Sequence, residues 1–423
     1  MTPSGGRLSD ASDRLLTSWI EIPAGVRRVC LFVAVAGLLP WLTITTVDMQ
    51  NWVVGAEQVI AGESVYGPRV TSPYTGRVVP RYPYLPSFAM LLAAGIVPFS
   101  FMYEIGFLPE VAYRAIARLI ANAPGYLGLL GIPLVVYRIS SEFGRPIETV
   151  EKTAEDWAFW GVLVVALAPP LWIQVIESGS DAFVALLVLL GVYMVMTDRW
   201  LLAGLLVGGA TFKFTALPLA AVLALYAISH GRNQVVAVAT GGILSQLPNV
   251  LYFVLFVDDF FFVLQERGTM SYRSGGTTAL ATAPFRLMGL EQWYIEVGFL
   301  IASVLFVTMG AVVAIHRGNL VLGFAVAYLS SSYFAPVGEV KASVLVILLL
   351  VEAAVHFRRK RVRYLAAGLL IVSFYSFLLP YGLIDYVSVV PFPWWDIVIQ
   401  GIEFGTVSVA LVGLLYVSGH DLS

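Results

Sequence analysis

Windows of about 20 apolar residues recur along the whole chain, with few charges inside them. A helix needs about that length to cross the ~30 Å hydrocarbon core of a bilayer. Most windows lack the polar stripe that marks a helix on the surface of a soluble domain. The pattern therefore predicts an all-α, polytopic transmembrane helix bundle. The expected spans are approximately 28–47, 113–138, 157–174, 181–197, 200–212, 214–228, 233–256, 293–315, 318–336, 340–357, 362–380 and 394–417.

A further apolar segment, 85–103, starts within YPYLP and contains Pro98, so it either spans the membrane or lies embedded near the outer face. The positive-inside rule favours the embedded alternative. If 85–103 does not cross, every basic cluster falls on the cytoplasmic side, whereas a full span would move the 139–156 loop outside. The clusters are Arg27/Arg28, Arg138/Arg145/Lys152, Arg199, Arg232, Arg317 and Arg358/Arg359/Lys360/Arg361/Arg363.

The expected fold is thus about twelve spans plus one embedded outer-face helix, in a multi-pass protein of the cell membrane. Residues 1–27 form a cytoplasmic tail and residues 28–423 a single transmembrane domain. Its main extracytoplasmic loops are 48–112 and 257–292. Polar residues at these loops are the first candidates for function, because the lipid-embedded remainder is mostly packing.

Composition narrows the function classes. The chain is 59% hydrophobic and 12% charged, with a mean hydropathy of +0.84, roughly half the charge of a soluble domain. A net charge of −2 argues against a nucleic-acid partner. The single cysteine, Cys30, forms no internal disulfide. The sequence contains no P-loop, no Gly-x-Gly-x-x-Gly motif and no histidine spacing typical of a metal site.

The first outward loop opens with TTVDMQNWVVGAEQVIAGESVYG and closes with VVPRYPYLPSF. Asp48 directly follows the first span. The residues after it predict an amphipathic helix on the interface, with Tyr66 as a headgroup-level anchor. The expected lipid-facing stripe is Trp52, Val53, Ala56, Val59 and Ile60.

The order of Asp48, Trp52, Gly62 and Tyr66, followed by Tyr-Pro-Tyr-Leu-Pro, resembles the first loop of C-type (GT-C) integral-membrane glycosyltransferases. Within them it looks most like the branch that uses polyprenyl- or dolichyl-phosphate mannose, whose loop reads Asp-aromatic, Gly-x-x-x-Tyr, Tyr-x-Pro-Pro. Met49 and Leu85 depart from that pattern. The likeness covers roughly residues 28–230, through ALAPPLWIQVIESGSDAF and GLLVGGATFKFTALPLA.

The resemblance implies transfer of a hexose, expected to be mannose, from a polyprenyl phosphate donor to a lipid- or protein-linked glycan on the extracytoplasmic face. Asp48 is the expected general base of an inverting displacement, and its alternative is a solvated carboxylate at a span end. The departing phosphate needs cations. The expected substrate-binding residues are Tyr82, Tyr84, Arg81, Glu177, Asp181, Lys213, Arg267, Arg273 and Lys341.

Several of these residues have a second interpretation. Each arginine could instead snorkel to the headgroups, whereas Lys213 and Lys341 interrupt apolar sequence, where an uncompensated charge is costly. Glu177 and Asp181 could join Asp48 around a divalent cation, bind acceptor hydroxyls, or cap the helix that begins at Asp181. The sequence itself requires no cofactor.

Two other functions remain open at this stage. A secondary transporter or lipid flippase would line a midplane pathway with polar residues, commonly between internal repeats. The ionisable residues here gather at one face instead, and no repeat is evident. A non-catalytic assembly subunit is the other alternative.

Overall fold

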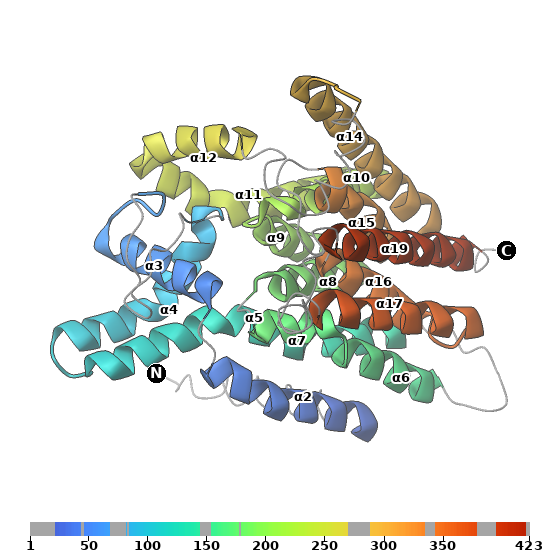
Figure 1. Cartoon of the computed structure of the whole chain (residues 1–423), viewed down its shortest axis with the longest axis horizontal. Coiled ribbons are helices and arrows are strands. Elements are labelled where there is room, and N and C mark those ends of the chain that lie inside the picture. Colours follow the sequence, from blue (N-terminus) through green and yellow to red (C-terminus); the bar gives the residue numbers. More distant parts are fainter. Residues whose placement is uncertain are drawn as a thin grey trace, which may run out of the picture.

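The computed structural model describes residues 22–43, 46–67, 82, 84–143, 154–176, 179–269, 288–334, 343–378 and 395–419. Within these ranges the protein is helical and has no strand (Figure 1). The helices are α2 (Ala24–Thr43), α3 (Val47–Ala61), α4 (Pro86–Glu104), α5 (Glu110–Phe143), α6 (Ala154–Ala166), α7 (Pro169–Ile176), α8 (Asp181–Met196), α9 (Trp200–Ala210), the 3-10 helix η1 (Phe214–Ala216), α10 (Leu217–His230), α11 (Arg232–Leu255), α12 (Val257–Thr269), α14 (Gln292–Arg317), α15 (Leu320–Leu329), the π-helix η2 (Ser330–Phe334), α16 (Ser343–Val355), α17 (Lys360–Leu378) and α19 (Trp395–Gly419).

Length and apolarity select the helices that could cross a membrane. Among the described residues six qualify, in α2, α4, α5, α11, α14 and α19, and α6 with α7, bent by 41°, add a seventh if counted as one span. This is consistent with a helical membrane protein. The predicted number of about twelve spans is not confirmed, because segments such as 200–212 and 214–228 form helices that are too short to qualify.

Helices α2 and α5 pack antiparallel. Trp41 Nε1 and Arg118 Nη2 donate to the carbonyls of Leu119 and Leu42, respectively, and Tyr126 donates to Ala34 further along. The end of α2 therefore lies near the beginning of α5. The intervening chain, which includes α4, returns to the same end of the bundle before α5 crosses it.

Glycines in α5 allow the next helices to approach closely. A Cβ at Gly128 would lie 2.5 Å from Ala182 Cβ, and one at Gly125 would lie 2.5 Å from the Gln174 carbonyl oxygen. Gly131 is similarly close to Leu186. The contacts of Gly128 and Gly131 hold α8 against α5 with the two helices running in the same direction. Asp181, the first residue of α8, therefore lies beside the middle of α5.

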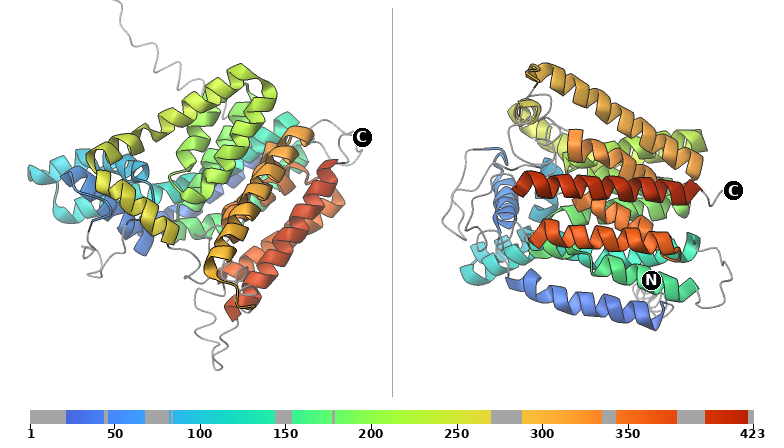
Figure 2. Two further views of the ribbon diagram at one scale, coloured as in Figure 1. Left: turned by 90° about the horizontal axis from the view of Figure 1, so that it is seen from above. Right: turned by 45° about the vertical axis from the view of Figure 1, so that its right-hand side comes forward.

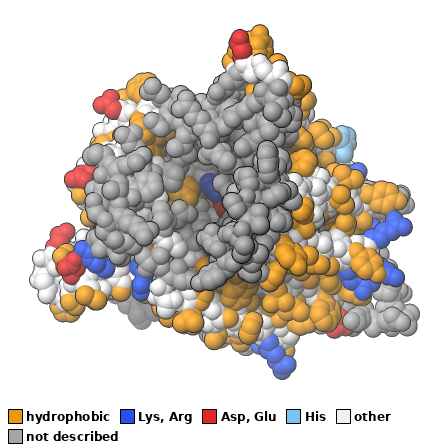
Figure 3. All heavy atoms as spheres, in the orientation of Figure 1, with side chains coloured by type: hydrophobic (Ala, Val, Ile, Leu, Met, Phe, Trp, Pro, Cys, Tyr) orange, Lys and Arg blue, Asp and Glu red, His pale blue; other side chains and the backbone are white. Residues whose placement is uncertain are grey.

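Several basic residues lie at one end of the helix bundle. Because α8 runs parallel to α5, Arg199 lies at the end where Arg138 lies, and Arg199 and Asn233 line one surface pocket. Arg363 stacks over Trp157 at the start of α6, 4.9 Å from the ring centre. We call this the basic end; Figure 3 shows Lys and Arg side chains there, on the side of the C-terminus.

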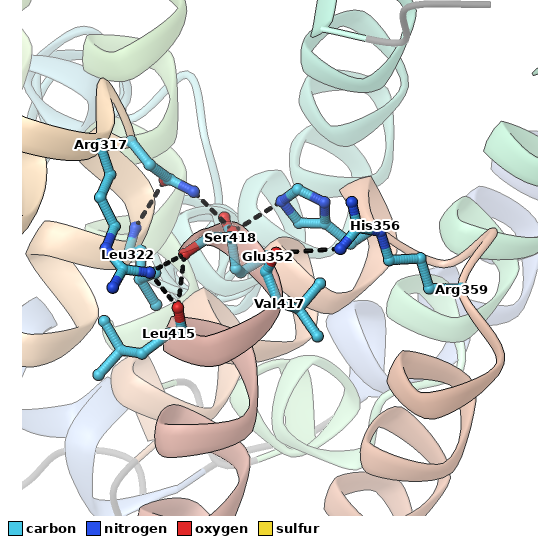
Figure 4. A network of polar contacts seen from close by, with 9 residues as sticks. Arg317, Leu322, Glu352, His356, Arg359, Leu415, Val417 and Ser418 are labelled. Atoms are coloured by element: carbon cyan, nitrogen blue, oxygen red, sulfur yellow. Dashed lines mark hydrogen bonds and ion pairs between the residues drawn. The ribbon is translucent and has the colours of Figure 1, made fainter. Parts of the chain in front are cut away.

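Hydrogen bonds at the basic end satisfy the last carbonyls of α19 (Figure 4). Arg317 donates to Leu415 O and to Ser418 Oγ, and Arg359 donates to Val417 O. A helix terminus has free carbonyls and a partial negative charge, so guanidinium groups stabilise it. Arg317 and Arg359 therefore act as caps from neighbouring helices.

A second group of contacts in Figure 4 surrounds Glu352, which is buried in α16. Asn319 Nδ2 donates to its Oε1 at 2.6 Å, and His356 Nε2 lies 3.0 Å from the same oxygen. Asn319 also caps α15 by accepting from Leu322 N. Together these contacts join α15 and α16 at the basic end.

The opposite end carries α3, α4 and α12. Figures 1 and 2 agree that these three helices lie together, on the side away from the C-terminal end of α19. Helix α4 packs against α3, α5 and α11. The candidate functional residues therefore have to be sought where these helices meet α8 and α10.

Candidate functional site

The central feature of the candidate site is a helix break that carries Lys213. Helix α9 ends at Ala210, and Lys213 precedes η1, from which α10 turns back toward the basic end. Trp200 and His230, at the far ends of α9 and α10, are 5.2 Å apart between ring centres, so the two helices form a hairpin. Lys213 lies in its turn.

The hairpin is short. With 11 residues, α9 rises about 16 Å, whereas the 20 residues of α2 rise about 30 Å. Lys213 therefore lies partway along the bundle rather than at its surface. At such a depth a charge without a partner would be costly.

Lys213 Nζ forms an ion pair with Asp181 Oδ1. Their side chains are only 17% and 13% exposed. Asp181 is the first residue of α8, and its backbone N–H donates to Gln174 Oε1 at 2.9 Å. The structure thus joins two residues that the sequence indicated separately. Asp181 does not cap α8, because the N-cap residue is Ser180 and no side-chain hydrogen bond caps the helix.

An aromatic wall, formed by Trp52, Tyr84, Phe88, Phe183 and Phe212, adjoins the ion pair. Phe88 and Phe212 stack with ring centres 4.3 Å apart, and Trp52 meets Phe88 edge-on at 5.1 Å. Phe212 directly precedes Lys213, and Phe183 follows Asp181 by two positions. The wall therefore extends from α3 to both partners of the ion pair.

Hydrogen bonds fix the beginning of α4 against this wall. Leu85 N donates to Phe212 O at 2.9 Å, and Ser87 N donates to Asn249 Oδ1 at 2.7 Å. Both amides belong to the region where α4 begins and lacks intrahelical partners. Leu85 of the YPYLP segment is thus hydrogen-bonded to Phe212, the residue before Lys213.

The predicted orientation of α3 is wrong. Trp52, Val53 and Ala56 are fully buried and contact the protein core, and Val59 and Ile60 pack against it. Tyr66 is buried too, and its hydroxyl donates to Tyr84 O at 2.6 Å rather than anchoring at headgroup level. An apolar stripe has the same periodicity whether it faces lipid or protein, so the sequence could not separate the two.

Tyr82 lies buried beside this helix. A Cβ at Gly55 would lie 2.8 Å from its ring, so only glycine permits the contact. Burial raises the pKa of the Tyr82 hydroxyl well above its ordinary value. Tyr82 is therefore a neutral phenol that packs against Tyr66 and Tyr84.

The remaining predicted residues are only partly described. Asp48 lies in the first turn of α3, one turn before Trp52, and Arg267 lies in α12, but both side chains fall outside the described part of the chain. Within the described part, no three His, Cys, Asp or Glu side chains group as a metal site would require. Residues outside the described ranges are Arg81, Glu177, Arg273 and Lys341.

One charged residue near the site was not predicted. Asp259, in the first turn of α12, accepts hydrogen bonds from Ser64 Oγ and Tyr252 OH. In the sequence it resembles an ordinary first-turn acid, favoured by the helix dipole. Its partner Ser64 is 195 positions away, so no local signal could have indicated the pair.

Comparison with known proteins adds no relative. No protein-family model matches the sequence, and no curated protein matches it either. The function is therefore inferred from the residues of the chain itself.

Proposed function

We propose that the protein transfers a hexose, with mannose the first candidate, from a polyprenyl phosphate carrier to a glycan acceptor on the extracytoplasmic face. The observation that carries this proposal is the largely buried Lys213–Asp181 ion pair at the helix break, beside the aromatic wall. An ammonium at this depth is suited to a lipid-linked phosphate, whose charge lies close to its lipid chain.

The position of the pair within the bundle supports the choice of face. Lys213 lies away from the basic end, where Arg199, Arg317 and Arg359 lie. Basic residues favour the cytoplasmic side of a membrane. The site then belongs to the extracytoplasmic half. The end of α2 and the beginning of α5 lie at the same end of the bundle, which supports an α4 that is embedded rather than spanning.

Buried polar atoms on α3 support a polar ligand. Asn51 Oδ1 and Trp52 Nε1 are buried and find no hydrogen-bond partner within the described part of the chain, and the same holds for Ser180 Oγ beside Asp181. A buried polar atom without a partner costs about 1–3 kcal/mol. Sugar hydroxyls would satisfy such atoms, and position 48 lies on the same face of α3, one turn from Trp52.

In this proposal Asp48 accepts the proton of the acceptor hydroxyl while the lipid phosphate leaves from the other side of the anomeric carbon. Lys213 stabilises the charge that develops on the phosphate. Asp181 holds Lys213 in place through their ion pair before the donor arrives. A single displacement inverts the anomeric configuration.

The direct test incubates membranes that contain the protein with labelled polyprenyl-phosphate mannose and a panel of glycan acceptors. We expect labelled glycan from wild type, and reduced use of the donor by Lys213→Met, by about 5- to 150-fold for a loss of about 1–3 kcal/mol. Membranes of cells that lack the protein are the control. Transport of the lipid-linked sugar without any transfer would instead favour a flippase.

A further inference from the structure

A hydrogen-bonded group at the N-terminus of α12 lies outside the residues used so far. Asp259 accepts from Ser64 Oγ at 2.7 Å and from Tyr252 OH at 2.6 Å. Ser64 follows α3, and Tyr252 is buried near the end of α11. The carboxylate thus joins three separate segments, α11, α12 and the turn after α3.

The direction of these hydrogen bonds is fixed by the carboxylate. An ionised carboxylate only accepts, so both hydroxyl protons point toward Asp259. The hydroxyl oxygens are then free to accept in turn: Tyr252 OH accepts from Val65 N at 2.8 Å, and Ser64 Oγ accepts from Tyr66 N at 3.1 Å. Asp259 therefore determines how the backbone of the turn is held.

From the turn, contacts lead to the aromatic wall. Tyr66 OH donates to Tyr84 O at 2.6 Å, and its ring lies 5.9 Å from that of Phe262 in α12. The Tyr84 ring meets Trp52 and Phe212, the residue before Lys213. A continuous series of described contacts thus connects Asp259 to the neighbourhood of the ion pair.

We propose that Asp259 is a positioning residue of the candidate site. By orienting the hydroxyls of Ser64 and Tyr252, it holds Tyr66 and thereby sets the place of Tyr84 in the aromatic wall. Helix α12 and the turn after α3 then form one unit beside the site. The inference deepens the proposed function, but the arrangement itself can be tested without it.

The test replaces Asp259 by Asn, which keeps the shape but adds an N–H donor that competes with the two hydroxyl protons. Amide hydrogen exchange would be followed in peptides covering 62–67 and 84–90. We expect exchange to become about tenfold faster or more in both, because a part-buried hydrogen bond to a charged group contributes that order to the free energy of local opening. Ser64→Ala, a milder change, should give a smaller effect in the same two peptides.

The matched control is Asp258→Asn, which removes the same charge from the same helical turn at an exposed side chain. It should exchange like wild type. Faster exchange confined to 62–67, or an equal effect in Asp258→Asn, would overturn the proposal. The double variant Asp259→Asn/Tyr252→Phe should exchange at least as fast in 62–67 as Asp259→Asn alone, because it also removes the acceptor of Val65 N.

A kinetic readout links the residue to the reaction. If the protein transfers the sugar, Asp259→Asn should raise KM for the lipid-linked donor more than it lowers kcat, because the reacting groups themselves are kept. If wild type transfers nothing, the proposed function fails, whereas the exchange experiment still decides the positioning role.

Discussion

Lys213 and Asp181 form an ion pair across 32 positions of sequence, and both side chains are largely buried. Removing one member of a buried pair leaves a charge without a partner, which costs up to about 3–5 kcal/mol, whereas removing both avoids this cost. We expect Asp181→Asn and Lys213→Met each to lower the thermal midpoint in detergent. The double variant should be more stable than the sum of the two losses predicts. Additive losses would show that the two side chains do not interact in the folded protein.

The two residues also illustrate what the sequence revealed. Both were named as site residues from segments that resemble the glycosyltransferases, and Lys213 also because it interrupts an apolar run. Their contact depends on Gly128 and Gly131, which let α8 approach α5, and that approach is a tertiary property. The helical class followed from the apolar windows. The shortness of α9 did not, because Lys213 interrupts the apolar run without fixing where the hairpin lies.

A second prediction concerns the glycine contacts that place Asp181. Gly128→Ala adds a Cβ 2.5 Å from Ala182 Cβ, so α5 and α8 must move apart. We expect a clear loss of thermal stability, of about 1–3 kcal/mol for overpacking. Gly405→Ala in α19 is the control, because nothing lies within 4 Å of its added Cβ. Equal midpoints for the two variants would contradict the close packing of α5 and α8.

At the basic end, Arg317→Gln removes a guanidinium that caps α19 through Leu415 O and Ser418 Oγ. We expect faster amide exchange in the last turns of α19, since losing a charged hydrogen bond costs about 1.5–3 kcal/mol. Arg28→Gln, which changes an exposed arginine of α2, should leave α19 unaffected. If amide protection in the last turns of α19 persists in Arg317→Gln, Arg317 does not stabilise the end of α19, and its positive charge serves only to orient the chain in the membrane.

Glu57 should make the stability of the protein depend on pH. It lies in α3 and accepts a hydrogen bond from Tyr113 OH at 3.1 Å. Burial raises the pKa of this carboxyl, and the Tyr113 bond offsets part of the effect. A folded-state pKa above the unfolded value, about 4.3, means that stability is highest below that pH and falls as pH rises through the folded value. Glu57→Gln should therefore be at least as stable as wild type at pH 7.5. The difference between their thermal midpoints should shrink or reverse toward pH 4.5. A wild-type advantage that grows with pH would show that Glu57 is better stabilised as an anion.

The catalytic prediction concerns Asp48, which follows the first span and lies on α3 one turn before Trp52. Asp48→Asn keeps the size of the side chain but cannot accept the proton of an acceptor hydroxyl. Loss of general-base assistance typically lowers the rate by about 10²–10⁴, and lost electrostatic stabilisation would add to that. We expect sugar transfer to fall by at least this range, with KM for the lipid-linked donor changed much less, because Lys213 and the aromatic wall remain.

The comparison requires intact protein, since a misfolded variant is also inactive. Asp48→Asn should be recovered from detergent in wild-type yield, monodisperse and with a similar thermal midpoint. A rate close to wild type in such a preparation would place the base elsewhere, and Glu177 is then the next residue to replace. Should every carboxylate at this end prove dispensable, sugar transfer itself would be excluded, and the Lys213–Asp181 pair would need an explanation as part of a transport pathway.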